Sequence, residues 1–222
     1  MAKIELYNMD CMEAMAKMPD RAYDLAIVDP PYGGTVKQGG YTVNKMGGKD
    51  YQHAYNLALW KQPPPTIDYF RELRRVSENQ IIWGANHCAS KLPFDSPCWI
   101  VWYKEREAQH WADCELAWAS FDSAVKIFKW AWDGFRQGDM KNKEKRIHPT
   151  QKPVRLYEWL LNNYAKPGDR ILDTHLGSGS SAIACDIMGY DFTGYEIDKE
   201  YYEAAKARLK QHQRQGVLLF GS

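Results

Sequence analysis

Residues 170–198 read RILDTHLGSGSSAIACDIMGYDFTGYEID. The apolar residues before Asp173 predict a short strand, a glycine-rich turn follows it, and residues 180–188 have the composition of a helix. A second predicted strand, residues 191–195, leads to the acidic side chain of Glu196. This order is typical of nucleotide-cofactor sites, in which glycines let the backbone approach the ligand and the acid binds ribose hydroxyls. The stretch therefore predicts an α/β fold with a cofactor at the carboxyl ends of its strands.

The glycine turn contains a single Gly-x-Gly, at residues 177–179, without the third spaced glycine of dinucleotide-binding turns. A nucleoside cofactor without phosphates therefore fits better than a dinucleotide, and S-adenosylmethionine is the obvious candidate. Glu196 follows Asp173 by roughly 20 residues, as expected of the acid that binds ribose. Taken alone, the turn could also be a plain connection between a strand and a helix.

The rest of the chain alternates strand and helix patterns, which predicts a mostly parallel sheet. The expected strands are residues 4–8, 23–28, 80–84, 98–104, 114–121, 170–173 and 191–195. The expected helices are residues 11–18, 67–76, 153–164, 180–188 and 199–213. Strand 170–173 is expected at the centre, with strands 191–195 and 4–8 following it to one side.

A second motif follows the predicted strand 23–28, where residues 26–34 read AIVDPPYGG. One interpretation is a simple turn, because two prolines can continue neither a strand nor a helix. The alternative is that the prolines hold the Asp29 carboxylate, the Pro30 carbonyl and the Tyr32 ring in fixed positions at the end of a strand. Open α/β sheets bind their ligands at such strand ends.

Together with HPTQKP at 148–153, the DPPY motif at 29–32 and the glycine turn resemble the beta class of amino-methylating DNA methyltransferases. In this class the catalytic motif precedes the cofactor motif. The resemblance extends over nearly the whole chain, through IELYNMDCMEAM (4–15), WGANH (83–87), ADCELAWASF (112–121) and GYEIDKEYYEAAKARL (194–209). The sequence departs from the family at DTHLGSGSS (173–181), so Thr174 and His175 receive no role from it.

The resemblance implies a Rossmann-like, S-adenosylmethionine-dependent methyltransferase fold with a mostly parallel sheet, one antiparallel strand and a circularly permuted motif order. The implied function is site-specific methylation of the adenine N6 amino group in DNA, by an orphan enzyme of phage or prophage type or by a restriction-modification enzyme. Related sites act on cytosine N4, on RNA adenine and on the amide of a protein glutamine, so these acceptors stay open. A catalytically silent module that only binds nucleic acid is the remaining alternative.

The implied catalytic residues are Asp29, Pro30, Pro31 and Tyr32. Asp29 and the Pro30 carbonyl would each accept one N–H of the target amine, and the carboxylate would stabilise the positive charge that develops on nitrogen. Tyr32 would stack on a base that has left the duplex.

The implied cofactor site is larger, and two parts of it can also be explained by a purely structural role. Its residues are Asp10, Cys11, Asp29, Thr150, Lys152, Asp173, Gly177, Ser178, Gly179, Ser180, Ser181, Glu196 and Ile197. Within this set, Asp10 would meet the adenine amine, and Thr150 and Lys152 would lie near the methionine end. Asp10 could instead only cap the helix that begins at Cys11, and HPTQKP could be only a turn that starts a helix.

The net charge of +1 conceals an uneven distribution. Residues 33–62 and 123–148 are both basic while the remainder is acidic, which favours a polyanion such as double-stranded DNA over these segments. The candidate DNA-binding residues are Lys37, Lys45, Lys49, Lys141, Lys143, Lys145 and Arg146. Solvated loops with incidental lysines are the alternative. We expect a single methyltransferase domain, residues 1–222, with loop 33–62 and segment 122–147 as its recognition elements.

Composition limits the other possibilities. A chain of 222 residues with 45% hydrophobic and 26% charged residues fits one globular domain. We expect a cytoplasmic protein without a membrane span, because no apolar run reaches about 18 residues and no secretory signal is present. Five spread cysteines without a Cys-x-x-Cys pair argue against a disulfide framework and a metal site. The short segment 122–147 leaves open whether a second subunit or a separate partner completes target recognition.

Overall fold

The computed structural model describes residues 2–32, 63–105, 112–132 and 136–220. Loop 33–62, with Lys37, Lys45 and Lys49, lies outside the described residues, so the predictions made for it stay predictions.

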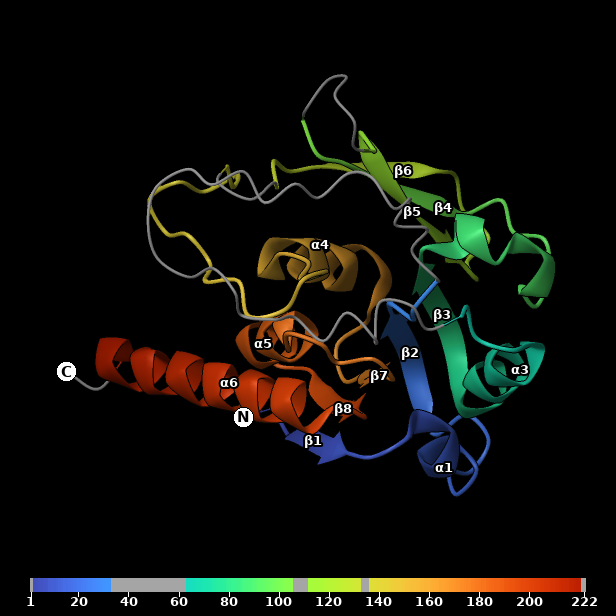
Figure 1. The fold of residues 1–222 in the computed structure, drawn as a ribbon, viewed down its shortest axis with the longest axis horizontal. Coiled ribbons are helices and arrows are strands. Elements are labelled where there is room, and N and C mark those ends of the chain that lie inside the picture. Colours follow the sequence, from blue (N-terminus) through green and yellow to red (C-terminus); the bar gives the residue numbers. More distant parts are fainter. Residues whose placement is uncertain (1, 33–62, 106–111, 133–135, 221–222) are drawn as a thin grey trace.

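The described strands form one sheet of eight, in the order β1-β8-β7-β2-β3-β5-β4-β6 (Figure 1). They are β1 (Ile4–Asn8), β2 (Tyr23–Val28), β3 (Ser77–Trp83), β4 (Trp99–Tyr103), β5 (Cys114–Ala119), β6 (Lys126–Lys129), β7 (Arg170–Asp173) and β8 (Asp191–Glu196). The first five strands in this order are parallel, and β6 is parallel to β4. Only β5 runs antiparallel to its neighbours β3 and β4. The predicted mostly parallel sheet with one antiparallel strand is confirmed, as is the neighbouring order of β7, β8 and β1.

Strand β6 was not expected from the sequence. It lies within the basic segment 122–147, and its four residues KIFK bury only Phe128, so the pattern lacks the alternation that marks a half-buried strand. The segment therefore begins as an edge strand of the sheet and continues as a loop.

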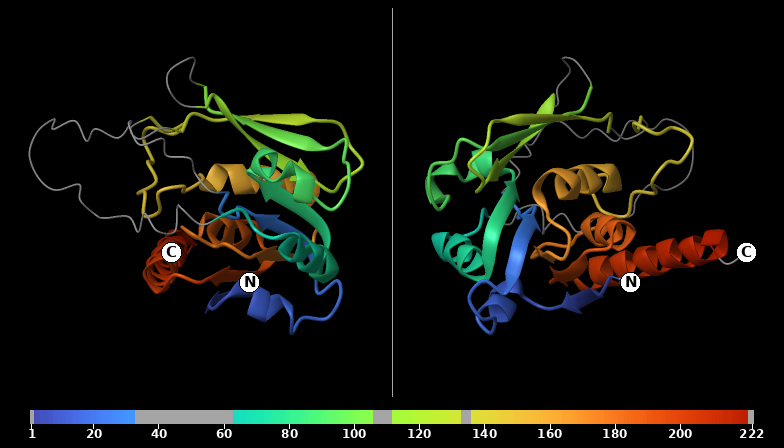
Figure 2. Two further views of the ribbon diagram at one scale, coloured as in Figure 1. Left: turned by 45° about the vertical axis from the view of Figure 1, so that its right-hand side comes forward. Right: turned by 180° about the vertical axis from the view of Figure 1, so that it is seen from behind.

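Helices cover both faces of the sheet (Figures 1 and 2). They are α1 (Cys11–Met15), α3 (Ile67–Val76), α4 (Val154–Tyr164), α5 (Ser180–Met188) and α6 (Lys199–Phe220), with two short 3₁₀ helices, η1 (Ala85–His87) and η2 (Ala89–Lys91). Helices α4 and α5 pack into one apolar cluster, and α1 and α3 pack into the other. No described helix is long and apolar enough to cross a membrane.

Two helix ends differ from the prediction. Helix α1 ends at Met15 and not at Met18, because the backbone tightens into turns in which Lys17 and Met18 bond residues three positions back. Pro19 follows directly and disfavours a helical residue before it. Helix α6 continues past the expected end at residue 213, to Phe220.

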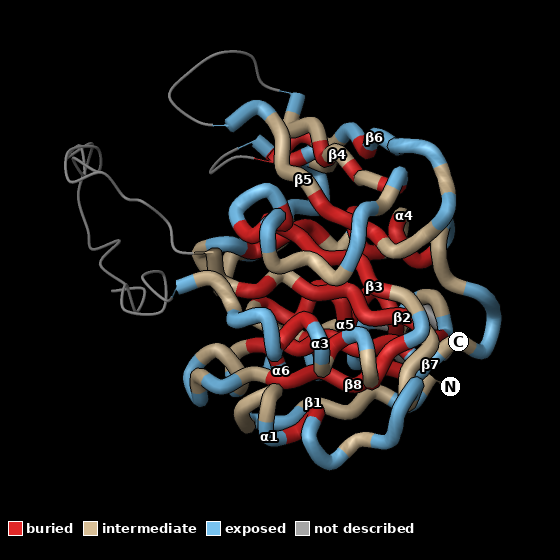
Figure 3. The backbone as a smooth tube through the Cα atoms, turned by 90° about the vertical axis from the view of Figure 1, so that its right-hand side faces the viewer, coloured by how far each residue is buried: buried red, intermediate tan, exposed pale blue. Residues whose placement is uncertain are grey.

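The middle of the sheet is buried on both faces (Figure 3). Along β2, Leu25 and Ile27 join the cluster of α4 and α5, whereas Ala26 and Val28 join that of α1 and α3. Such a continuous apolar run is expected of a parallel strand covered by helices on both sides. Because β2, β7 and β8 are parallel, the residues that follow them meet at one edge. The chain leaves β7 toward β8 on one side and leaves the neighbouring β2 toward β3 on the other, and open α/β sheets bind ligands where the connections diverge in this way.

Candidate active site

Asp29 lies directly after β2, with its side chain 14% exposed. Its Oδ2 accepts a hydrogen bond from the Lys152 ammonium. Its Oδ1 is buried and has no hydrogen-bond partner among the described residues. Burial raises the pKa of Asp29, and Lys152 opposes that rise. The carboxylate thus has one buried oxygen without a hydrogen-bond donor, and buried acceptors rarely lack a donor in folded proteins.

Lys152 is the centre of a buried charge cluster. Its Nζ lies 3.2 Å from Glu115 Oε2, and Glu115 Oε1 lies 2.5 Å from Lys104 Nζ. Burial would lower the pKa of Lys152, but Asp29 and Glu115 hold it well above its ordinary value. Burial likewise opposes ionisation of Glu115, but the two lysines bring its pKa to about 2. Lys152 is therefore a cation and Glu115 an anion.

The ammonium of Lys152 contacts Asp29. The place near the methionine end of the cofactor, which the resemblance implied for Lys152, stays a prediction. Sequence reasoning missed Glu115 and Lys104. A signal was present in β5, where Glu115 is the one charged side chain of the strand CELAWA.

Tyr32 is held by the segment WGANH. Its ring stacks on His87 with centroids 4.6 Å apart and planes 4° from parallel. Gly84 adopts φ +67°, and a Cβ there would overlap the Tyr32 ring. Gly84 is required both for its left-handed backbone and for this close approach. The aromatic ring of the DPPY motif is thus held in place by Gly84 and His87 of the segment WGANH.

The glycine turn is organised by two carboxylates. Asp173 is buried and accepts hydrogen bonds from Ser181 Oγ, at 2.6 Å, and from the His175 backbone N–H, at 3.0 Å. Burial raises its pKa to about 7 against these hydrogen bonds. Glu196 accepts the Gly177 N–H, at 2.9 Å, and the Asp198 N–H, also at 2.9 Å.

The serines of the turn point inward and are buried. Ser178 and Ser180 share a hydrogen bond of 3.0 Å, and Arg208 of α6 donates to the Ser178 carbonyl and the Ser180 hydroxyl, both at 2.9 Å. Arg208 also pairs with Glu144 at 2.6 Å, and Glu144 accepts the Val154 N–H at the start of α4. Arg208 therefore ties the glycine turn to the segment before α4, a link that sequence spacing did not indicate.

Several other predicted cofactor residues lie at the carboxyl ends of β1 and β8. Asp10 accepts the Met12 N–H at 2.7 Å and so caps α1, and the contact with the cofactor adenine that was implied for it stays a prediction. The Asn8 side chain bonds the carbonyls of Glu196 and Ile197, and Ile197 is 57% exposed. Cys11 is partly buried, and this burial, helped by the nearby charges of Asp10 and Glu196, raises the pKa of its thiol. These residues form a rim next to the glycine turn.

Thr150 is exposed and bonds His148 Nδ1, at 3.1 Å, within the HPTQKP segment. It makes no cap for α4, whose N-cap is Pro153. Earlier in the same loop, Lys141, Lys143 and Lys145 are exposed, whereas Arg146 is partly buried and donates to the Pro149 carbonyl. The three lysines are available to a partner, and Arg146 is committed in part to its own loop.

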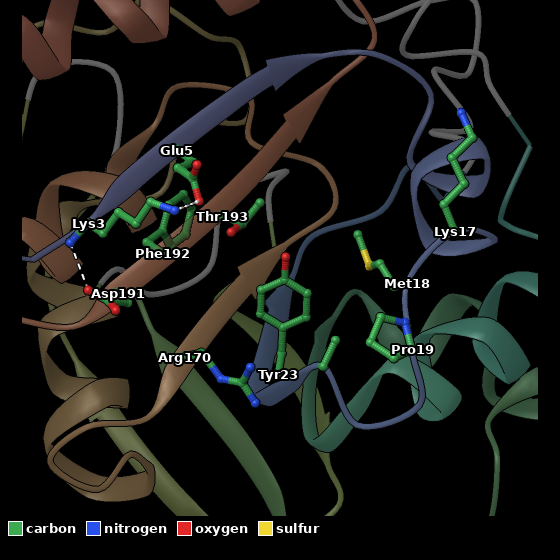
Figure 4. A pocket seen from close by; sticks show the side chains of 11 residues that line it. Lys3, Glu5, Lys17, Met18, Pro19, Tyr23, Arg170, Asp191, Phe192 and Thr193 are labelled. Carbon is green, nitrogen blue, oxygen red and sulfur yellow. Dashed lines mark hydrogen bonds and ion pairs between the residues drawn. The ribbon is translucent and has the colours of Figure 1, made fainter.

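A pocket lies at the opposite edge of the sheet (Figure 4). It is lined at the amino ends of β1, β2, β7 and β8 by residues such as Lys3, Tyr23, Arg170 and Asp191. Lys3 pairs with Glu5 and bonds Asp191 through its backbone N–H. None of the predicted site residues lines this pocket, so it is separate from the active site.

Comparisons with known proteins agree with this geometry. The chain matches a family model, N6_N4_Mtase, described as DNA methylase, over residues 58–207. It is 27% identical to the Type II methyltransferase M2.DpnII of Streptococcus pneumoniae, over 94% of this chain and 90% of the relative.

Solved structures show the same fold. The M1.HpyAVI–SAM complex is 23% identical with a TM-score of 0.54, covering 92% of this chain and 99% of that one. The PvuII cytosine-N4-specific DNA methyltransferase is 11% identical with a TM-score of 0.63, covering 96% and 91%. The architecture is thus the Rossmann-like fold of S-adenosylmethionine-dependent methyltransferases.

Proposed function

Because this chain belongs to the DNA methylase family, we propose that it transfers a methyl group from S-adenosylmethionine to the N6 amino group of adenine in DNA. The family accounts for the DNA substrate and for the methyl donor. The relative M2.DpnII is named a Type II methyltransferase, which supports a place in a restriction-modification system. The choice of adenine rests on the resemblance to the beta class, in which Asp at the first position of the motif, here Asp29, and the order of the motifs favour DNA adenine.

The observation that carries the proposal is the unused Oδ1 of Asp29. It is buried at the carboxyl end of β2, and β7, which leads into the glycine turn, is the neighbouring strand. A planar amino group that entered this site would satisfy the acceptor, because an amine supplies two N–H donors. Pro30, the next residue, is buried, and its carbonyl is the acceptor that we propose for the second N–H.

The residues of the glycine turn fit a nucleoside cofactor. Each carboxylate oxygen of Glu196 accepts one backbone N–H, and each keeps a lone pair for a ribose hydroxyl. The exposed Ile197 side chain offers an apolar surface beside this acid for a flat ring. S-adenosylmethionine, when bound, supplies an electrophilic methyl group.

Within this scheme Asp29 orients the amine and stabilises the positive charge that develops on its nitrogen. The same carboxylate is the nearest base for the proton that the nitrogen must lose after transfer. Burial raises the pKa of Asp29, which brings its basicity closer to that task. Tyr32, held by Gly84 and His87, provides a rigid platform on which a flipped base can stack.

The DNA contacts belong to the proposal as well. Lys141, Lys143 and Lys145 are exposed on a loop that the Gln137 side chain fixes through two hydrogen bonds to the Glu144 backbone. A fixed basic loop suits contact with phosphates, which position a protein on DNA without reading its sequence.

The test is transfer of a labelled methyl group from S-adenosylmethionine to duplex DNA, followed by digestion to nucleosides and mass spectrometry. We expect N6-methyladenine as the product, and sequencing of the methylated positions would then give the target site. N4-methylcytosine would favour the alternative acceptor. Cofactor binding by calorimetry without any transfer would favour the silent module.

A further inference from the structure

Four charged side chains from separate parts of the chain form a row behind the DPPY motif. They are Asp29 after β2, Lys152 before α4, Glu115 in β5 and Lys104 after β4. The charges alternate along the row, and Glu115 bridges the two lysines with one oxygen each. The exposed fractions of the four side chains are between 3% and 25%, so solvent screens them only weakly.

The direct contact between Lys152 and Asp29 poses a problem for the reaction. The target nitrogen becomes positive during transfer, and a lysine beside the catalytic carboxylate both neutralises that carboxylate and repels the nitrogen. Lys152 cannot avoid this by losing its proton, because its pKa is held well above its ordinary value. Another anion must therefore offset it, and Glu115 is placed to do so.

We propose that Glu115 is a positioning residue that holds Lys152 and offsets its charge, so that Asp29 keeps the negative potential that the target amine requires. Lys104 pairs with the other carboxylate oxygen of Glu115 and therefore reduces the negative charge with which Glu115 offsets Lys152. The inference rests on the proposed function, because it assigns the row to the methyl-transfer site.

The surroundings of the row strengthen the interaction. Lys152 Nζ lies 5.5 Å from the centroid of the Trp83 ring, and Lys104 Nζ lies 4.9 Å from that of Trp102. Both indoles are buried and apolar, which keeps the local dielectric low. A purely structural role explains the row poorly, since well-packed apolar residues often stabilise a core as well as a buried ion pair does.

Four further titratable groups face the row, namely Tyr32, Tyr157, His148 and Asp173. Burial holds the pKa of both tyrosines above the ordinary value, so they stay protonated near neutral pH. Burial, with Lys152, lowers the pKa of His148 to about 4, so it stays neutral. Asp173, with a pKa of about 7, titrates in the relevant range and must be distinguished from Asp29.

The test is titration of the aspartate carboxyl carbons by NMR in the cofactor-free protein, with Asp29→Asn assigning the Asp29 signal and Asp173→Asn that of Asp173. Glu115→Gln removes an anion and should lower the pKa of Asp29 by about one unit. Lys104→Met removes a cation and should raise it by a similar amount. The double variant restores the charge balance, so its Asp29 pKa should return close to that of the parent. Glu78→Gln, which breaks an exposed pair with Arg21, is the matched control and should leave it unchanged.

Single-turnover methyl transfer against pH gives the second readout. The acid limb of the profile should move with the Asp29 pKa, and Glu115→Gln should lower the plateau rate on the order of tenfold through the uncompensated charge of Lys152. The double variant should recover most of that loss, which a packing defect would not allow.

Shifts of the same sign in both single variants, or no shift in either, would overturn the inference. If Glu115→Gln fails to fold, Lys104→Met alone decides, with an upward shift supporting the inference and none overturning it. The expected NMR shifts in a parent protein that transfers no methyl group would overturn the proposed function and leave the charge row established.

Discussion

The two halves of the active site hold their carboxylates by different means. On the side of β2, the carboxylates of Asp29 and Glu115 are paired with lysines, and the side chains compensate one another in charge. On the side of β7 and β8, the carboxylates of Asp173 and Glu196 accept backbone N–H groups and a serine hydroxyl, and no salt bridge to a described cation engages them. The catalytic half should therefore respond most to changes of charge, and the cofactor half to changes of backbone geometry and hydrogen bonding.

Removal of Lys152 tests the catalytic half most severely. Lys152→Met leaves Asp29 and Glu115 without their shared cation in a buried site. We expect the free energy of unfolding to fall by about 3–5 kcal/mol, the usual effect of removing one partner of a buried pair. Denaturant unfolding at pH 7 measures it, with Lys104→Met as the control for the loss of a less central lysine. A loss no larger than that of the control would contradict the central place of Lys152.

Replacement of Asp29 tests chemistry apart from binding. Asp29→Asn keeps the shape and one acceptor but loses the charge, so single-turnover methyl transfer should fall by about 10²- to 10³-fold, or roughly 3–4 kcal/mol. Affinity for S-adenosylmethionine should stay nearly constant. Asp24→Asn, at the other end of β2 and paired with Arg170, is the matched control. A rate for Asp29→Asn within a few-fold of the parental rate would contradict a catalytic role for Asp29 and favour the interpretation of the DPPY motif as a simple turn.

The pH dependence of stability tests the cofactor half. The pKa of Asp173 is raised to about 7 in the folded protein, so the folded state binds its proton more tightly than the unfolded state does. This contribution is fully present below the ordinary value of 3.8 and is lost as pH rises toward 7, by up to about 1.4 kcal/mol per pH unit. Unfolding at pH 5, 6 and 7 should show the parent losing stability relative to Asp173→Asn. Parallel curves for the two proteins would contradict the raised pKa.

The smallest expected effect concerns Glu196. Glu196→Gln keeps one acceptor for the backbone N–H groups and loses the charge, so affinity for S-adenosylmethionine should fall about tenfold, or 1.4 kcal/mol. Calorimetry measures it, with Glu200→Gln in the exposed first turn of α6 as the control. At saturating cofactor the variant should transfer methyl groups at nearly the parental rate. A strong loss of rate at saturating cofactor would contradict the assignment of catalysis to the β2 side and of cofactor binding to the side of β7 and β8.

The sequence predicted the elements that depend on local pattern. The apolar run of β2, the glycine turn and the acid that ends β8 were all found with small errors at the ends of elements, because periodicity and turn residues act over short distances. Asp29, Asp173 and Glu196 were placed at one edge because parallel strands share the direction of their carboxyl ends.

The contacts that organise the site could not be predicted in the same way. Lys152 meets Glu115, and Arg208 meets Glu144, across long separations in the chain. Nothing in a linear pattern states which charged residues will pair once the sheet has formed. The role of Gly84 beneath Tyr32 likewise depends on two segments meeting.

The pairing of β1 bears on how the chain acquires its fold. Among the described strands, β1 lies at the end of the sheet and pairs only with β8, and the hydrogen bond from Lys3 to Asp191 spans 188 residues. During synthesis β1 must therefore wait until residues 191–196 have been made before its partner strand exists. Contacts of such long sequence separation slow folding, because the entropy of closing the loop opposes them until late. An early β1 with unpaired backbone groups is thus the segment most exposed to wrong pairing, and a nascent chain stalled before residue 191 should leave it accessible to protease.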